Sequence, residues 1–346
     1  MSFIKLIGKF LSFIGVLLIV LLVTVYSMGL IFCYGPSSHA RNLFVTTLLE
    51  TGQMKFVVSL FMSDDKVQEI VNSNSMASFD EEIDNNLINI DSSLDKDGIE
   101  LVEITGSTYM AKMIIVNDPS RVKLATIYDG SWKEYGVTLD KLVNDNDAFA
   151  GVNGGLYVSE SNKGGKPMGL VVRDGVIEHN SPSGIAGLHL VGFSEDNLLK
   201  VIDLSGKNAS EVEKVIKDEK IRDAVAFQEE ASDANNHFVK LIINGESREV
   251  NGSGSGANPR TAIGQRKDGA VLLLVTDGRG ANGHLGATAQ DLIEVMEEYG
   301  AVNAANIDGG SSSSMYYDGK YEMTSVTLYY SNSSWRLPTG FIVEKR

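Results

Sequence analysis

The chain has 346 residues, of which 43% are hydrophobic and 22% charged, a globular composition that excludes a disordered or fibrous protein. Thirty Lys and Arg against 45 Asp and Glu give a net charge of -15. Such a negative field repels phosphate polymers, so no nucleic acid partner is expected. The single cysteine, Cys33, excludes an intramolecular disulfide framework and a cysteine-rich zinc site, because both need at least two thiols.

A long apolar segment lies close to the N-terminus. No charged residue occurs from Phe10 to Ser38. A bilayer span needs about 20 apolar residues, whereas the apolar part of a cleaved signal peptide has about 7 to 15. We therefore expect an uncleaved transmembrane anchor at 10–34, with a cleaved signal peptide as the alternative. Lys5 and Lys9 precede it, so the positive-inside rule places residues 1–9 in the cytoplasm and the remaining chain outside, in a single-pass protein of the cell membrane.

A short helical stem and a linker are expected at 35–95. Residues 40–72 carry apolar residues at helical spacing, interrupted at Thr51 and Gly52, and Ser63 marks the start of the second part. Amphipathic helices packed on the membrane or on the body are the alternative. Residues 72–98 are rich in Asn, Ser and Asp, which is the composition of a linker.

The body, at 96–346, shows short strands separated by turns and few helices. Helical periodicity is clear only at 138–144, 209–218 and 289–299. Strands are expected at 99–105, 109–116, 122–128, 148–152, 169–172, 188–193, 239–243, 270–276, 301–307 and 325–330. The fold class that follows is α+β, a β-rich mixed-sheet domain with a few helices, preceded by a transmembrane helix and a short helical stem.

Two carboxylates follow apolar strands near the C-terminus. Asp277 comes directly after the run 270–276, and Asp308 directly after 301–307. Between them, Thr288 and Asp291 have the spacing of a capping box at the start of a helix. If both strands are parallel in one sheet, a single crossover brings the two carboxylates to the same edge. They are then a candidate acid/base or nucleophile pair.

Three other segments share this character. The loop after Asp308 has two glycines and four serines, a backbone that binds anions well. Asn153 precedes two glycines after an apolar strand, and Arg260 lies between a Gly/Ser-rich loop and another apolar strand. A plain turn and a surface ion pair are the alternatives for these two. Of five histidines only His284, in the glycine-rich loop 277–287, attracts interest, and a solvated loop histidine is its alternative. No metal-ligand spacing is present, so neither a metal nor a cofactor is expected.

In chain order, five motifs resemble those of the phosphodiester glycosidase family. They are NGGLY at 153–157, NPRTAIG at 258–264, DGRG at 277–280, GAT at 286–288 and NAANIDGGSSSSM at 303–315. The resemblance covers roughly residues 100–346 and implies hydrolysis of the bond between the anomeric carbon of a sugar and a phosphodiester. One departure is Ser311, which stands where the family pattern has a third glycine and narrows the pocket if a side chain is not tolerated there.

Carried onto this chain, the resemblance and the residue chemistry give catalytic and substrate-binding candidates. Arg260 and the amides after Asp308 are expected to hold phosphate, Asp308 or Asp277 to stabilise the oxocarbenium-like centre or activate water, and Asn153 to bind sugar hydroxyls or an N-acetyl carbonyl. The remaining candidates for substrate contact are Gly154, Gly155, Thr261, Arg279, His284, Gly309, Gly310, Ser311 and Ser312.

The function expected is therefore a membrane-anchored extracytoplasmic hydrolase that cleaves the glycosidic bond of a sugar-1-phosphodiester, with an N-acetylhexosamine-type sugar, in cell-envelope or exopolysaccharide material. Its partners are then this substrate, free or as a sugar-phosphate polymer, and the membrane. A non-catalytic envelope polysaccharide-binding module on the same fold is the alternative. A transferase that passes the glycosyl group to another hydroxyl is a third reading.

Overall fold

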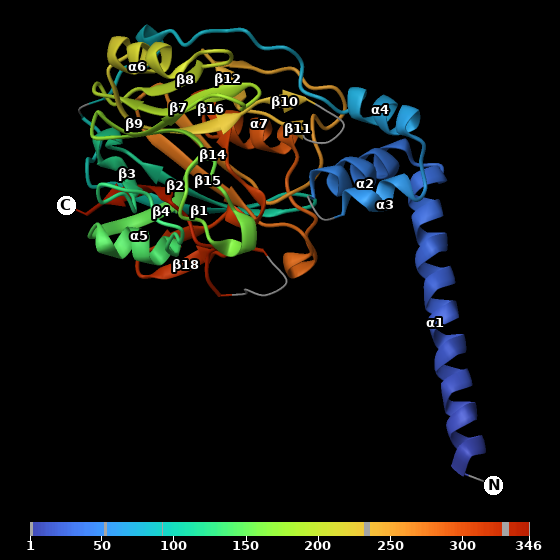
Figure 1. Ribbon diagram of the computed structural model, residues 1–346. Coiled ribbons are helices and arrows are strands. Elements are labelled where there is room, and N and C mark those ends of the chain that lie inside the picture. Colours follow the sequence, from blue (N-terminus) through green and yellow to red (C-terminus); the bar gives the residue numbers. More distant parts are fainter. Residues whose placement is uncertain (1–2, 52–53, 92, 232–235, 327–331, 346) are drawn as a thin grey trace.

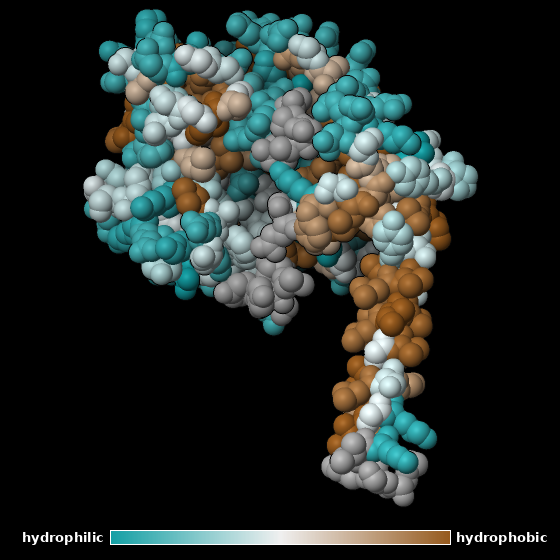
Figure 2. Space-filling view, turned by 45° about the vertical axis from the view of Figure 1, so that its right-hand side comes forward, coloured by the Kyte–Doolittle hydropathy of each residue, from teal (hydrophilic) through white to brown (hydrophobic). Residues whose placement is uncertain are grey.

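The computed structural model describes residues 3–51, 54–91, 93–231, 236–326 and 332–345. Helix α1 (Phe3–Tyr34) projects away from the rest of the molecule, and Figure 1 shows the short helices α2 to α4 between it and a β-rich body. From Leu6 to Tyr34 most side chains of α1 are apolar and exposed, as the largely brown surface in Figure 2 shows. By length and composition α1 is long enough to cross a membrane, a test that a signal sequence also passes.

The stem that follows α1 is helical, as expected. It consists of α2 (Ser38–Glu50), α3 (Lys55–Ser59) and α4 (Asp64–Asn72). These helices enclose a small cluster of buried side chains: Cys33, Val45, Val58, Met62, Val67, Ile70 and Val71. The stem therefore has its own apolar core, with the buried thiol as part of it.

The segment between stem and body is bound to the body along its length. Ala77 N–H donates to the carbonyl of Glu249, and Asn89 N–H to that of Lys267, each at 2.9 Å. The Lys240 ammonium donates to the carbonyl of Glu81 at 2.7 Å. The polar composition of this segment matches a linker, but its backbone is paired and it is not a free tether.

Three sheets form the body, and every strand pair among the described residues is antiparallel. In spatial order the first sheet contains β1 (Ile99–Thr105), β2 (Met110–Val116), β15 (Val271–Thr276), β14 (Thr261–Arg266), β16 (Ala301–Ile307), β12 (Lys240–Ile243) and β13 (Glu246–Ser247). The second contains β18 (Lys320–Met323), β17 (Met315–Tyr317), β4 (Ala148–Asn153), β19 (Thr339–Glu344) and β3 (Val122–Thr126). The third contains β6 (Val176–Ser181), β5 (Gly169–Arg173), β9 (Ile221–Gln228), β7 (Leu188–Ser194) and β8 (Leu199–Asp203). A separate short hairpin pairs β10 (Glu230–Ala231) with β11 (Asn236–His237).

One central core lies among the three sheets, and each sheet is covered on its other face by a helix. Side chains such as Ile263, Phe341 and Phe193, one from each sheet, meet in the central cluster. Helix α7 (Ala289–Glu298) packs on the first sheet, α5 (Leu139–Asp145) on the second and α6 (Ala209–Asp218) on the third (Figure 1). The β-rich α+β class is confirmed.

The two strands that precede Asp277 and Asp308 are not direct neighbours in the sheet. Strands β15 and β16 run in the same direction, but β14 lies between them and is antiparallel to both. Both strands still end at the same edge of the sheet. The expected strand 325–330 is not formed at residues 325–326, and its remainder lies outside the described residues.

Candidate active site

One edge of the first sheet gathers the charged candidates. Asp277 follows β15 and Asp308 follows β16, while Arg260 immediately precedes β14 between them. Thr261 is paired with Val275 on one side and with Ile307 on the other, so the three charged residues lie nearly level. Adjacent strands are about 4.8 Å apart, which places the backbones of the two aspartates roughly 10 Å from each other.

The surroundings of Asp308 strongly change the proton affinity of its carboxylate. The Gly309 N–H and the Ser312 hydroxyl donate to it, and the Arg279 guanidinium is near. Burial nevertheless raises its pKa to about 7, because loss of hydration outweighs these stabilising contacts. Protonated and ionised Asp308 are therefore both populated at neutral pH, as acid/base catalysis requires.

Arg279 is held beside Asp308 by the loops around it. Its Nη1 donates to Ser311 Oγ at 2.8 Å and its Nε to Asn258 Oδ1 at 3.4 Å. A Cβ on Gly310 would stand 2.7 Å from Arg279 Nη2 and would displace the guanidinium, and the φ of +62° at Gly310 also favours glycine. Arg279 itself has a φ of +53°, a conformation that costs a non-glycine residue about 1 to 3 kcal/mol. Ser311, which stands where the family pattern has a third glycine, therefore accepts a hydrogen bond from Arg279.

Asp277 is almost fully buried and both of its oxygens are engaged. Oδ1 accepts from Met110 N–H at 2.8 Å, and Oδ2 lies 2.6 Å from His284 Nδ1. The His284 side chain is 28% exposed, so this pair reaches the surface through the imidazole. Asp277 holds the glycine-rich loop 277–287 in place through these contacts. Of the pair, the His284 side chain is the one with substantial solvent exposure.

Asn153 connects the end of β4 to the Asp308 loop. Its Nδ2 donates to the carbonyl of Asp308 at 2.6 Å, and its Oδ1 accepts from Thr261 Oγ1 at 2.7 Å and from Ser314 N–H at 3.2 Å. Asn153 and Thr261 have no exposed surface. Both side chains hold the Asp308 loop through these contacts, and their expected contact with substrate stays a prediction.

The two glycines after Asn153 are required by packing. A Cβ on Gly154 would stand 2.2 Å from Thr339 Oγ1, and one on Gly155 would stand 2.5 Å from the carbonyl oxygen of Ala226. Both glycines are buried against neighbouring strands, and their expected contact with substrate stays a prediction. By contrast, Gly309 and Gly310 remain partly exposed beside Asp308.

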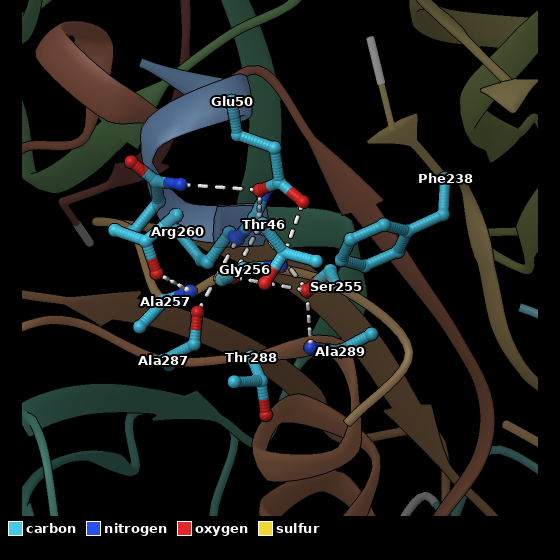
Figure 3. A network of polar contacts seen from close by, with 12 residues as sticks. Thr46, Glu50, Phe238, Ser255, Gly256, Ala257, Arg260, Ala287, Thr288 and Ala289 are labelled. Carbon is cyan, nitrogen blue, oxygen red and sulfur yellow. Dashed lines mark hydrogen bonds and ion pairs between the residues drawn. The ribbon is translucent and has the colours of Figure 1, made fainter. Parts of the chain in front are cut away.

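Arg260 is bound on the side of the site that faces the stem. Its Nη2 lies 2.5 Å from Glu50 Oε2 and donates to Gly256 O at 2.9 Å and Ser255 Oγ at 3.2 Å. The guanidinium also stacks on Phe238, 5.0 Å from the ring centroid. Figure 3 shows this enclosed network, in which Glu50 comes from α2 of the stem.

Two further residues join the site without having been singled out from the sequence. The Tyr157 hydroxyl lies 2.9 Å from Ser312 Oγ, and burial together with the charge of Asp308 raises its pKa. Tyr157 closes the NGGLY motif, so its position in that motif was the available signal. Glu50 lies 210 residues from its partner Arg260, and no motif marks it.

A carboxylate with a pKa of about 7, an arginine and several hydroxyls lie together at one sheet edge. The phosphodiester glycosidase family model matches residues 146–344, more than half of the chain. The chain belongs to this family.

Solved structures and a curated relative are similar to the chain at greater distance. The zebrafish N-acetylglucosamine-1-phosphodiester alpha-N-acetylglucosaminidase catalytic domain, auto-inhibited by its pro-peptide, is 20% identical with a TM-score of 0.53, covering 75% of this chain and 87% of that one. It shares the fold. A putative exported protein from Burkholderia pseudomallei is 15% identical, with a TM-score of 0.44 over 68% of this chain and 74% of the other. The SPbeta prophage-derived uncharacterized protein YomE of Bacillus subtilis (strain 168) is 28% identical over 162 residues, 45% of this chain and 23% of its own length, so this chain spans less than a quarter of that relative.

Proposed function

We propose that the protein is a membrane-anchored hydrolase outside the cytoplasm that cleaves the glycosidic bond of a sugar-1-phosphodiester in cell-envelope or exopolysaccharide material, with an N-acetylhexosamine-type sugar. The family gives the reaction class. The observation that carries the proposal is the pairing of Asp308, whose pKa is raised to about 7, with the guanidinium of Arg279. One group exchanges protons near neutrality, and the other neutralises a phosphate.

In the proposed reaction, ionised Asp308 accepts a proton from water while the water oxygen bonds to the anomeric carbon. The bond between that carbon and the phosphate oxygen breaks, and its electron pair leaves with the phosphate. A free sugar and a phosphomonoester result. Arg279 and Ser311 stabilise the charge that gathers on the phosphate, which is a good leaving group and needs little help from an acid. The second carboxylate, that of Asp277, acts by holding the His284 imidazole beside the site.

The location rests on α1 and the charges before it. Lys5 and Lys9 precede the apolar segment, and the exposed apolar side chains of α1 suit the interior of a bilayer. The body would then lie outside the cytoplasm, near the envelope polymers proposed as its substrate. A cleaved signal peptide remains the alternative function of this helix.

A non-catalytic envelope polysaccharide-binding module is the second candidate, and specific contacts favour it. Asn153, Asp277 and Arg260 are all bonded within the protein, as side chains with purely structural functions would be. Turnover distinguishes the hydrolase from the binding module. The group that receives the sugar, water or another hydroxyl, distinguishes hydrolysis from glycosyl transfer.

The test uses the full chain purified in detergent. It is incubated with UDP-N-acetylglucosamine or with envelope polymer, with and without a surplus of glycosyl acceptor. Free sugar is quantified together with the second product, which is UDP from the nucleotide sugar and a phosphomonoester from the polymer. Release of both products supports hydrolysis, whereas a glycosylated acceptor supports transfer. Binding of polymer without any product would reject the enzyme and leave the binding module.

A further inference from the structure

The stem is held at one fixed level of helix α1. The ring centroids of Tyr26 and Phe61 are 5.3 Å apart, and the rings of Phe32 and Phe44 are stacked with centroids 4.9 Å apart. The Tyr34 hydroxyl donates to the carbonyl of Phe61 at 2.5 Å. Because the stem packs on the end of α1 in this way, its depth in a bilayer follows from that of α1.

This level corresponds to the outer boundary of a bilayer that α1 crosses. Lys9 is the last charged residue before the apolar segment, and a hydrocarbon core about 30 Å thick takes up about 20 helical residues. If the core begins at Phe10, it ends near Gly29, against which the Phe61 ring packs. At about 1.5 Å per residue, Tyr34 then lies roughly 7 Å further out, in the layer of lipid headgroups.

The stem carries exposed apolar side chains beside this boundary. Met54, Phe56 and Leu60, in and around α3, are 41%, 61% and 62% exposed. Figure 1 shows α3 next to the upper end of α1, and Figure 2 shows brown and tan surface on the stem in the same place. Large apolar side chains at the boundary between hydrocarbon and headgroups are stabilised by contact with lipid. The exposed apolar surface of the stem therefore agrees with the depth derived from α1.

A cleft with two cations opens at the headgroup level. It has a volume of about 260 Å³ and lies between the end of α1 and helices α2 and α4. Arg41 of α2 and Lys66 of α4 line it together with Tyr34, and the Lys66 ammonium lies 5.1 Å from the centroid of the Tyr34 ring. Among the residues that the structure describes, neither cation forms a salt bridge, although the chain has a net charge of -15.

One carboxylate lies on the lining of the same cleft. It belongs to Glu69 of α4, and within the described parts of the chain it forms no salt bridge with Arg41 or Lys66. Two cations and one carboxylate leave the cleft with a net charge of +1. The cleft is therefore locally positive in an acidic protein, and it can bind an anion between its two cations.

We propose that this cleft binds the phosphate headgroup of an anionic phospholipid in the outer leaflet. A guanidinium donates two parallel hydrogen bonds to phosphate oxygens, and an ammonium binds them as a point charge. The acyl chains of the same lipid lie along the apolar surface of α1. The proposal rests on the membrane location in the proposed function. A lipid bound there fixes the height of the body above the membrane, because the stem contacts the body through Glu50 and Arg260.

The experiment uses native mass spectrometry to measure which lipid stays on the full chain after its release from neutral detergent micelles. The chain is incubated with equal concentrations of phosphatidylglycerol and phosphatidylcholine that have the same acyl chains, and the ratio of the two adducts with one lipid is recorded. Phosphatidylcholine carries the same phosphate next to a cationic choline, which a positive cleft disfavours. We expect the wild type to prefer phosphatidylglycerol about fivefold, the effect of one net positive charge near a lipid headgroup.

Variants of the cleft should change this preference in both directions. Arg41→Gln and Lys66→Gln each remove one cation and should abolish the preference, whereas Glu69→Gln removes the carboxylate and should raise it about fivefold. Lys217→Gln, at an exposed position of α6, is the matched control with the same loss of charge and should leave the preference unchanged. The gain expected from Glu69→Gln keeps the test valid if a cation variant does not fold by circular dichroism.

Three results would overturn the lipid site. The first is equal amounts of the two adducts in the wild type. The second is a preference that none of the folded cleft variants changes. The third is displacement of phosphatidylglycerol by an equal concentration of glycerol phosphate, which has the phosphate without acyl chains and would assign the cleft to a soluble phosphate.

The same spectra separate failure of the lipid site from failure of the proposed function. They give the mass of the chain recovered from the membrane fraction, which shows whether α1 is retained. A retained α1 without any lipid preference keeps the membrane location and rejects the lipid site. A mass that lacks α1 rejects the location, and the lipid site with it, because α1 forms one wall of the cleft. Sugar release is measured independently, so a lipid preference without turnover keeps the lipid site and rejects the reaction.

Discussion

Replacing Asp308 by Asn should stabilise the protein at alkaline pH while it removes the proposed base. Asparagine keeps the shape of the side chain and an oxygen that accepts from Gly309 N–H, but it carries no charge. The wild-type carboxylate has a pKa of about 7 in the fold and 3.8 as its ordinary value. The folded protein therefore binds this proton more tightly than the unfolded chain.

The size and the pH dependence follow from this difference. A change from 3.8 to about 7 corresponds to at most about 4 kcal/mol. Asp308 keeps some solvent-exposed surface, so solvent screening reduces the energy that corresponds to the pKa change. We expect the ionised carboxylate to destabilise the fold by about 1 to 3 kcal/mol. The wild type loses this stability as the pH rises from about 4 to 7, and the penalty is complete above pH 7. The variant has no such dependence.

The assay is guanidinium unfolding of the full chain in detergent at pH 4.5 and pH 8, followed by fluorescence of the two tryptophans, Trp132 and Trp335, both in the body. Asp308→Asn should be more stable than the wild type at about pH 8 and nearly equal to it at about pH 4.5. Asp218→Asn, at an exposed position of α6, is the matched control and should show no such difference. Equal stability of Asp308→Asn and the wild type at pH 8, or a difference that does not change with pH, would refute a raised pKa at Asp308.

Four further predictions follow from the same contacts. Below about pH 7 the wild-type kcat/KM should fall about tenfold per pH unit as Asp308 is protonated, and a flat profile would contradict its role as base. Gly310→Ala should displace Arg279 and lower kcat/KM about tenfold or more in steady-state kinetics, with a stability loss of only about 1 kcal/mol; unchanged kinetics would show that the arginine is not needed. Asn153→Ala leaves buried groups unpaired, so denaturant unfolding should show a loss of about 2 to 4 kcal/mol, and an unchanged midpoint would count against its positioning role. Asn208→Ala removes the capping box of α6, far from the site in the fold, and should cost about 1 kcal/mol in the same unfolding assay with kcat unchanged; a loss of activity at full stability would contradict this.

Local signals in the sequence predicted much of the fold. The long uncharged segment gave α1, and the capping box at Thr288 is present at the start of α7. The strands before Asp277 and Asp308 were visible as apolar runs because they are buried on both faces. The insertion of β14 between them depends on pairing with strands elsewhere in the chain, and no local pattern encodes that choice.

The candidate site was predictable to a similar extent. Asp308 became a candidate because it follows an apolar strand and precedes a glycine-rich loop. The burial of Asn153 and the engagement of Asp277 depend on partners from other sheets and loops, such as Thr261 and Met110. The contact of Glu50 with the loop before β14 joins stem and body over 210 residues. Its only trace in the sequence is a negative charge at the end of an expected helix.

The most direct measurement compares the rate of sugar release from UDP-N-acetylglucosamine, or from envelope polymer, by the wild type, Asp308→Asn and Asp218→Asn. The proposed mechanism predicts release by the wild type and by Asp218→Asn at similar rates, and a fall of at least about 100-fold in kcat for a folded Asp308→Asn, because a positioned general base contributes at least that much. Release by Asp308→Asn at the wild-type rate would contradict the role of Asp308, and no release by the wild type from either substrate would contradict the proposed hydrolase.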